Sequence, residues 1–209
     1  MTSLRDELGG RHTAPTPYGI LCPPGWRRTH PRELLEGPAT EAALARMKAA
    51  GRADLVLQTR SMLAQYRRSI EDLKVIELYL PPADAEAGPL PATLMVSPLV
   101  RPATVGWDAA LGRLSRGKPV ESADFAQTPM WLWRTGDSIR DEHATVATRE
   151  THYVVPVPGE EPSRRALRFQ FTALAPDGLA SDDVESLIAL GDVMMSTMRW
   201  LDAPGAGRA

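Results

Sequence analysis

The chain has little cysteine and no long apolar run. Its single cysteine, Cys22, excludes an internal disulfide framework and fits a reducing compartment. No apolar stretch approaches the roughly 18 residues that a membrane-spanning helix needs. The first residues also lack the apolar core of a secretory signal. These absences predict a cytoplasmic protein without a membrane span.

Motifs for catalysis and for cofactor binding are missing as well. There is no G-x-S-x-G, and Cys22 lies in an apolar run before two prolines, so we expect a buried, unreactive thiol. Glycine pairs occur only in the terminal tails, which leaves no glycine-rich phosphate loop. The histidines are scattered, and none forms H-E-x-x-H or pairs with the cysteine at zinc spacing: His12, His30, His143 and His152. We therefore expect no catalytic constellation, no metal and no cofactor.

Charge of one sign is also missing. The formal net charge is −2, and general affinity for nucleic acid requires a concentrated positive field. We therefore predict no nucleic-acid partner. Three groups of arginines stand among acids or at the ends of predicted elements, where solvated surface is favoured: Arg27, Arg28 and Arg32; Arg60, Arg67 and Arg68; Arg164, Arg165 and Arg168.

The clearest pattern is two alternating strands followed by an amphipathic helix. From Thr151, the residues Tyr153, Val155 and Val157 share one face. In the next strand, 167–173, Phe169 and Phe171 lie opposite polar neighbours, and this period of two is typical of a half-buried antiparallel strand. The helix begins near Ser181 after Pro176-Asp177-Gly178, and its apolar stripe is formed by Val184, Leu187, Ile188, Gly191, Met194, Met195 and Met198.

Further elements are predicted along the chain. Residues 18–22 form a strand, and Trp26 folds back onto the sheet. A helical stretch over 40–73 is divided by Gly51. The remaining predictions are strands at 75–80, 92–100 and 120–126, a helix at 105–114, a strand at 129–134 that is covered on both faces, and a charged, turn-like segment at 136–147. Within 92–100, Pro98 predicts an edge strand or a bulge.

This order of elements favours the α+β class, with helices packed on one mostly antiparallel sheet. Regular alternation of strand and helix, which a doubly wound sheet needs, breaks down after Val120. We predict a flexible N-terminal arm over 1–16, a single α+β domain over 17–201 and a disordered tail over 202–209.

Two groups of residues are candidates for a site. Asp137, Asp141, Glu142 and His143 could hold a cation or act in acid–base chemistry, but Arg140 among them opposes cation binding, and a solvated hairpin or loop is favoured. His152, on the face opposite Tyr153, is expected to look at solvent or at a helix edge. The second group, Trp107, Trp131 and Trp133, could line a ligand pocket, although filling the core is the favoured interpretation.

The two ends of the chain resemble the PsbP-like superfamily. The segment Tyr18-Gly-Ile-Leu-Cys-Pro-Pro-Gly-Trp26 is similar to its opening of strand, proline, glycine and tryptophan, and the strand 167–173 with the helix ending at Met198-Arg199-Trp200 is similar to its close. This superfamily includes a photosystem subunit, a Ran-release factor, secretion-effector chaperones and LpqN-type lipoproteins. The segment Tyr153-Val-Val-Pro-Val-Pro-Gly159 also looks like uncharacterised cytosolic actinobacterial proteins.

The resemblance covers roughly 17–27 and 150–201, and no functional residue of the family maps onto this chain. It implies a three-layer α-β-α sandwich in a family that mostly binds proteins. Unlike the lipoprotein branch, the chain shows no signal or lipobox cysteine, which argues against an envelope role. Three functions therefore stay open. The first is a non-enzymatic adaptor or chaperone-like protein with an unidentified protein partner, and it is favoured. The alternatives are a small-molecule or lipid carrier with a tryptophan-lined cavity, and an enzyme or metal site at Asp137–His143 and His152.

Overall fold

The computed structural model describes residues 17–82, 91–141, 144–159, 163–175 and 181–201. The predicted arm at 1–16, the predicted tail at 202–209 and the predicted turn at 176–178 lie outside these ranges. Among the helices of the described residues, none combines the length and the apolar character that crossing a membrane requires.

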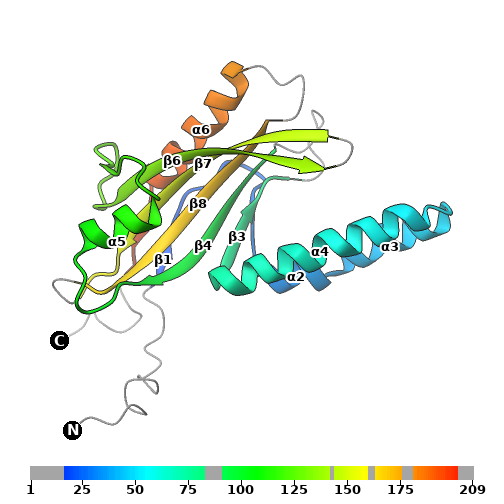
Figure 1. Ribbon diagram of the computed structural model, residues 1–209, viewed down its shortest axis with the longest axis horizontal. Coiled ribbons are helices and arrows are strands. Elements are labelled where there is room, and N and C mark those ends of the chain that lie inside the picture. The colour runs from blue at the N-terminus through cyan, green and yellow to red at the C-terminus, as the bar shows by residue number, and fades with distance from the viewer. Residues whose placement is uncertain (1–16, 83–90, 142–143, 160–162, 176–180, 202–209) are drawn as a thin grey trace, which may run out of the picture.

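The described residues form a seven-stranded antiparallel sheet in the order β2-β3-β4-β8-β7-β6-β5 (Figure 1). A separate ribbon pairs β1 with β9. The strands are β1 (Tyr18–Gly19), β2 (Arg27–Thr29), β3 (Glu77–Leu80), β4 (Ala92–Val100), β5 (Glu121–Ser122), β6 (Trp131–Asp141), β7 (Ala144–Pro156), β8 (Arg165–Ala175) and β9 (Arg199–Trp200).

The largest apolar cluster lies between the sheet and α6 (Ser181–Ser196). Phe169 and Phe171 of β8 are fully buried, as are the methionines Met194 and Met195 of the helix. Trp26 stacks on Phe171 with ring centroids 6.5 Å apart. The predicted packing of the methionine row on the phenylalanine face, and the return of the tryptophan onto the sheet, are therefore confirmed.

The other face of the sheet is covered at one end by α5 (Trp107–Leu114). Leu111 of this helix is buried in one cluster with Trp133 of β6 and Val154 of β7. On the α6 side of the same strand, Leu132 is also buried. The prediction that residues 129–134 are covered on both faces is confirmed.

At the β3 edge the same face is covered by α2 (Pro31–Glu36) and α4 (Ala53–Leu73). Leu35, Ile70 and Leu78 are buried together there. Helices thus pack on both faces of one antiparallel sheet, and the predicted α+β sandwich is confirmed.

A helical hairpin of α3 (Pro38–Ala49) and α4 extends away from the sheet (Figure 1). Gly51, between the two helices, has a φ of +71°, a conformation that glycine adopts at little cost. The division of the helical stretch at Gly51 is confirmed.

The position of β4 corrects one prediction. Pro98 predicted an edge strand or a bulge, yet β4 lies between β3 and β8. Its pairing with β3 ends at Val96, however, and Pro98 lies opposite Leu167 of β8. In this register the backbone nitrogen of Pro98 faces away from β8, toward the side where β3 has not yet begun. The missing N–H therefore removes no hydrogen bond from the sheet.

The hairpin of β6 and β7 corrects another. The segment 136–147 was predicted to be turn-like, but both strands run through it, paired from Trp131 opposite Val154 to Asp141 opposite Ala144. Asp137, Arg140 and Asp141 therefore belong to a paired strand rather than to a turn. The sequence also gave no signal for β2 or α2.

Gly191→Ala is expected to lower the free energy of unfolding by about 1–3 kcal/mol, because overpacking a filled interior carries that penalty. A Cβ at Gly191 would lie 2.7 Å from Cγ of Phe171. The matched control is Gly112→Ala in α5, where a Cβ meets nothing within 4 Å. This control substitution should raise the free energy of unfolding by about 0.5–1 kcal/mol, because alanine favours a helix over glycine. Denaturant melts measure both, and stabilisation by both substitutions would contradict the close packing of α6.

Candidate functional site

Polar side chains lie on the face of the sheet opposite α6, between the regions that α5 and α4 cover. On β8, residues alternate between Phe169 and Phe171 toward α6 and polar residues on the other side. The register places Gln170 opposite Met95 of β4 and opposite His152 of β7. The polar residues on this face of the sheet form a group that we call the polar band: Thr93 and Ser97 of β4, Arg168, Gln170 and Thr172 of β8, Glu150 and His152 of β7, and Thr135 of β6.

A hydrogen-bonded cluster occupies the centre of the polar band. Nη2 of Arg168 donates to Oε1 of Gln170 at 2.6 Å and lies 3.3 Å from Nδ1 of His152. Nε2 of the same imidazole lies 3.3 Å from Oε2 of Glu150 and 3.3 Å from Oγ1 of Thr135. His152 is 5% exposed and stacks on Trp133, with centroids 4.8 Å apart.

These contacts select one tautomer of His152. A guanidinium can only donate hydrogen bonds, so Nδ1 must accept from Arg168 and Nε2 must carry the proton. The Nε2–H then faces the carboxylate of Glu150. Because the hydroxyl of Thr135 and this carboxylate meet the same ring nitrogen, the cluster lacks the arrangement of a hydroxyl on one nitrogen and a carboxylate on the other that activates a nucleophile.

The two charged residues of the cluster have shifted pKa values. The hydrogen bond from His152 lowers the pKa of Glu150, against the opposing effect of burial. Burial lowers the pKa of Arg168. Nε of Arg168 is buried and has no hydrogen-bond partner within the described part of the chain. The polar band therefore holds a guanidinium that the protein solvates incompletely.

The first alternative predicted for His152, that it looks at solvent, is wrong, because the side chain is almost fully buried, and the second, a helix edge, stays a prediction. The alternation placed it correctly on the face opposite Tyr153. Its partners Glu150 and Arg168 were not foreseen as site residues. Glu150 shares the alternation of β7, but Arg168 reaches the same place only through the register between β7 and β8.

The predicted ligand-binding tryptophans gather at the α5 end of this face. Trp107 and Trp131 lie with their ring centroids 5.5 Å apart. Nε1 of Trp107 donates to the carbonyl oxygen of Ser163 at 2.8 Å, and Trp133 is 2% exposed. These contacts are those of a packed cluster, and a ligand role for the three residues stays a prediction.

The Asp137–His143 candidate is not brought into a site by the described residues. Asp137 and Asp141 belong to β6, and the structure does not describe their side chains. Glu142 and His143 lie outside the described ranges. Across the described residues, no three or more histidine, cysteine or carboxylate positions are grouped so that they could hold a metal ion.

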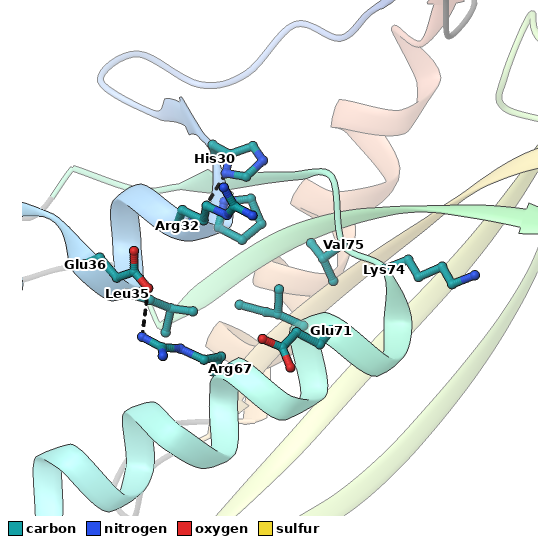
Figure 2. Close-up of a pocket in the computed structure, with 10 residues that line it drawn as sticks. His30, Arg32, Leu35, Glu36, Arg67, Glu71, Lys74 and Val75 are labelled. Carbon is teal, nitrogen blue, oxygen red and sulfur yellow. Dashed lines mark hydrogen bonds and ion pairs between the residues drawn. The ribbon is translucent and has the colours of Figure 1, made fainter. Parts of the chain in front are cut away.

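A hollow of about 440 Å³ lies between α2 and α4 (Figure 2). Leu35 and Val75 form part of its wall, and Arg67 bonds Glu36 across it at 2.9 Å. Glu71 and Lys74 line it as well. A neighbouring hollow of about 290 Å³ shares His30. Both signs of charge line the larger hollow, and neither hollow matches the tryptophan-lined cavity that a carrier would need.

A second polar network lies at the β3 edge of the α6 face. The carboxylate of Glu77 accepts hydrogen bonds from Tyr18 and Arg28, and a longer one, 3.4 Å, from the hydroxyl of Tyr79 to Oε2. Burial raises the pKa of Tyr18 far above its ordinary value, and it also raises the pKa of the half-buried thiol of Cys22. The raised pKa keeps this thiol protonated, as expected for an unreactive cysteine.

Comparisons with known proteins give little further guidance. No family model matches the chain, and no curated protein matches its sequence. A crystal structure from Bacteroides thetaiotaomicron is similar with a TM-score of 0.37 and 13% identity. The match covers 60% of this chain and 38% of that chain. The function must therefore be argued from the residues of the chain itself.

Glu150→Gln is expected to lower the free energy of unfolding at pH 7 by about 1–2 kcal/mol, because a charged acceptor is lost. The pKa of Glu150 is lowered in the folded state, so the carboxylate stabilises the fold fully above its unfolded pKa of about 4.3. This contribution disappears as the pH falls through the lowered pKa. Denaturant melts from pH 7 to pH 3 should show the difference between the two proteins shrink.

The same substitution in a His152→Ala background is the control. The imidazole is the largest cause of the lowered pKa, so the pH-dependent part of the difference should be smaller there. A difference that stays constant down to pH 3 in the original background would contradict the proposed role of the carboxylate.

Proposed function

We propose that the protein is a non-enzymatic adaptor or chaperone-like protein that docks a protein partner on the polar band. One observation carries the proposal: Arg168, His152 and Glu150 lie half-buried or buried in the middle of a sheet face. At such positions apolar side chains would let a helix pack directly on the strands. Replacing a buried ionic network by apolar residues is often neutral or stabilising, so a role in recognition accounts better for this composition than stability does.

The arrangement of the polar band supports binding over catalysis. His152 contacts the hydroxyl and the carboxylate through the same nitrogen, and its other nitrogen faces a guanidinium. The ring is therefore held as a hydrogen-bonding element rather than as a base with an acceptor site facing a substrate. Small-molecule sites are usually concave and largely apolar, whereas the two hollows described above lie at α2, outside the polar band.

Kinship with the PsbP-like superfamily, in an uncharacterised actinobacterial branch, is part of the proposal. It is supported by the segment from Tyr18 to Trp26 and by the closing strand and helix. The antiparallel sheet with helices on both faces is the architecture that this resemblance implies. A cytoplasmic location is proposed with it, supported by the single cysteine.

A photo-crosslinking residue at Leu174 should capture a protein partner in cells of the source organism. Leu174 is 36% exposed on β8 and shares the face of Gln170 and Thr172. The same residue at Ala189, exposed on α6, is the matched position on the other side of the molecule. Mass spectrometry of the conjugates should identify a protein that is enriched at Leu174 over Ala189.

Adding Thr172→Phe should abolish this capture, because the ring fills the polar band with bulk and adds no charge. The unfolding midpoint of the variant shows whether the fold is kept. Equal capture at both positions, or capture that Thr172→Phe leaves unchanged in a folded protein, would remove the support for docking at the polar band.

A further inference from the structure

Arg168 is the cationic member of the polar band, and within the described residues no group of opposite charge contacts it directly. Its Nη2 contacts two neutral groups, Gln170 and His152. In the described residues, no carboxylate oxygen lies within 4 Å of its guanidinium, although Glu150 acts on it from a longer distance. Other arginines of the chain do have such partners: Arg28 pairs with Glu77, and Arg134 pairs with Asp192 at 2.8 Å.

A guanidinium in this position attracts an anion. Desolvating a charge without a counter-ion is costly, and buried charges in proteins are usually paired. Nη2 already donates to Gln170 and His152, so a carboxylate would meet the guanidinium through its remaining donors. Ser97 lies directly opposite Arg168, and the amide nitrogen of Gln170 is a further donor, because its oxygen accepts from the arginine.

We infer that Arg168 is the receiving group for an aspartate or glutamate side chain of an acidic protein partner. This inference rests on the proposed function, because it names the chemistry that the polar band recognises. A protein is favoured over a free carboxylic acid because the polar band lies on a sheet face, away from both described hollows. A partner surface can cover such a face and exclude water from the ion pair.

The helical hairpin of α3 and α4 also carries more positive than negative side chains. Between residues 38 and 73 there are six basic residues against four acidic ones: Arg46, Lys48, Arg52, Arg60, Arg67 and Arg68, all exposed, and Glu41, Asp54, Glu71 and Asp72. The chain as a whole has a net charge of −2. An acidic partner would therefore be steered toward this part of the molecule at low salt.

The test is an NMR titration of the ¹⁵N-labelled full chain with an octapeptide of alternating glutamate and serine. The probe signals are the Nε–Hε resonance of Arg168, assigned by its absence in Arg168→Met, and the indole N–H of Trp133, which stacks on His152. Both should shift and saturate with the peptide. A peptide with glutamine at every glutamate position should shift neither.

Arg168→Met should raise the peptide's dissociation constant, measured from the shift of the Trp133 signal, at least tenfold. The unfolding midpoint should stay equal or rise. Arg168→Lys keeps the charge without the planar guanidinium and should also weaken peptide binding. The matched control is Arg165→Met, which removes an equal charge from the same strand on the opposite face. It should leave the Arg168 signal shifting as before. Binding that survives Arg168→Met, or an Arg168 signal that ignores the peptide, would overturn the inference.

Other ligands would produce different patterns. Saturation of the Arg168 signal by sodium acetate as tightly as by the peptide would overturn a protein source in favour of free carboxylates. A DNA duplex that competes more tightly than the peptide would overturn it in favour of phosphates. If crosslinking at Leu174 captures a partner while the peptide leaves Arg168 unmoved, this inference fails and the proposed function stands. Peptide binding without a captured partner would leave Arg168 as a carboxylate-binding group and would overturn the docking of a protein on the polar band.

Discussion

Strand β8 must satisfy two environments at once, and the rest of the molecule depends on how it does so. Phe169 and Phe171 are fully buried on one side, where α6 approaches closely enough that Gly191 leaves no room for a Cβ beside the ring of Phe171. The intervening positions carry Arg168 and Gln170. Because successive side chains of a strand point to opposite faces, the tight packing of α6 fixes the register, and this register brings the polar residues of β7 and β8 together.

The polar band is bounded by two apolar clusters rather than surrounded by solvent. One cross-strand row runs from Leu78 and Met95 near α4, through Gln170 and His152, to Trp133 beneath α5. His152 is therefore buried although its nearest neighbours along the row are polar or aromatic. In such an environment each hydrogen bond is electrostatically stronger than in water, and each missing one costs more.

The sequence predicted the elements in which one period dominates a long segment. The strand 167–173, the final helix and the break at Gly51 were predicted correctly, because alternation or a single glycine decides them locally. β2 is three residues, Arg27–Thr29, with no apolar period, and it exists through its pairing with β3 about fifty positions along the chain. Such a pairing leaves no local signal.

The polar cluster was predictable only in part. Alternation placed His152 on the correct face, but its stacking on Trp133 depends on the pairing of β6 with β7. Arg168 is adjacent to His152 only because β7 and β8 pair in one register, and a slip of one residue would turn it to the other face. Pro98 misled because proline excludes a hydrogen bond on one side of a strand only, and β3 ends before reaching it.

The chain itself shows what a purely structural charge network looks like. At the β3 edge, the carboxylate of Glu77 accepts hydrogen bonds from Tyr18 and Arg28, and it neutralises the arginine. At α6, Asp192 accepts from both Arg134 and Tyr153 and anchors the helix. In the polar band the pattern differs: among the described residues, Nη2 of Arg168 contacts only the neutral side chains of Gln170 and His152, and two buried atoms, Nε of Arg168 and Oγ1 of Thr172, have no hydrogen-bond partner. Both other networks neutralise their arginine with a carboxylate from within the fold, and because no described carboxylate does so at Arg168, a carboxylate supplied from outside is favoured there.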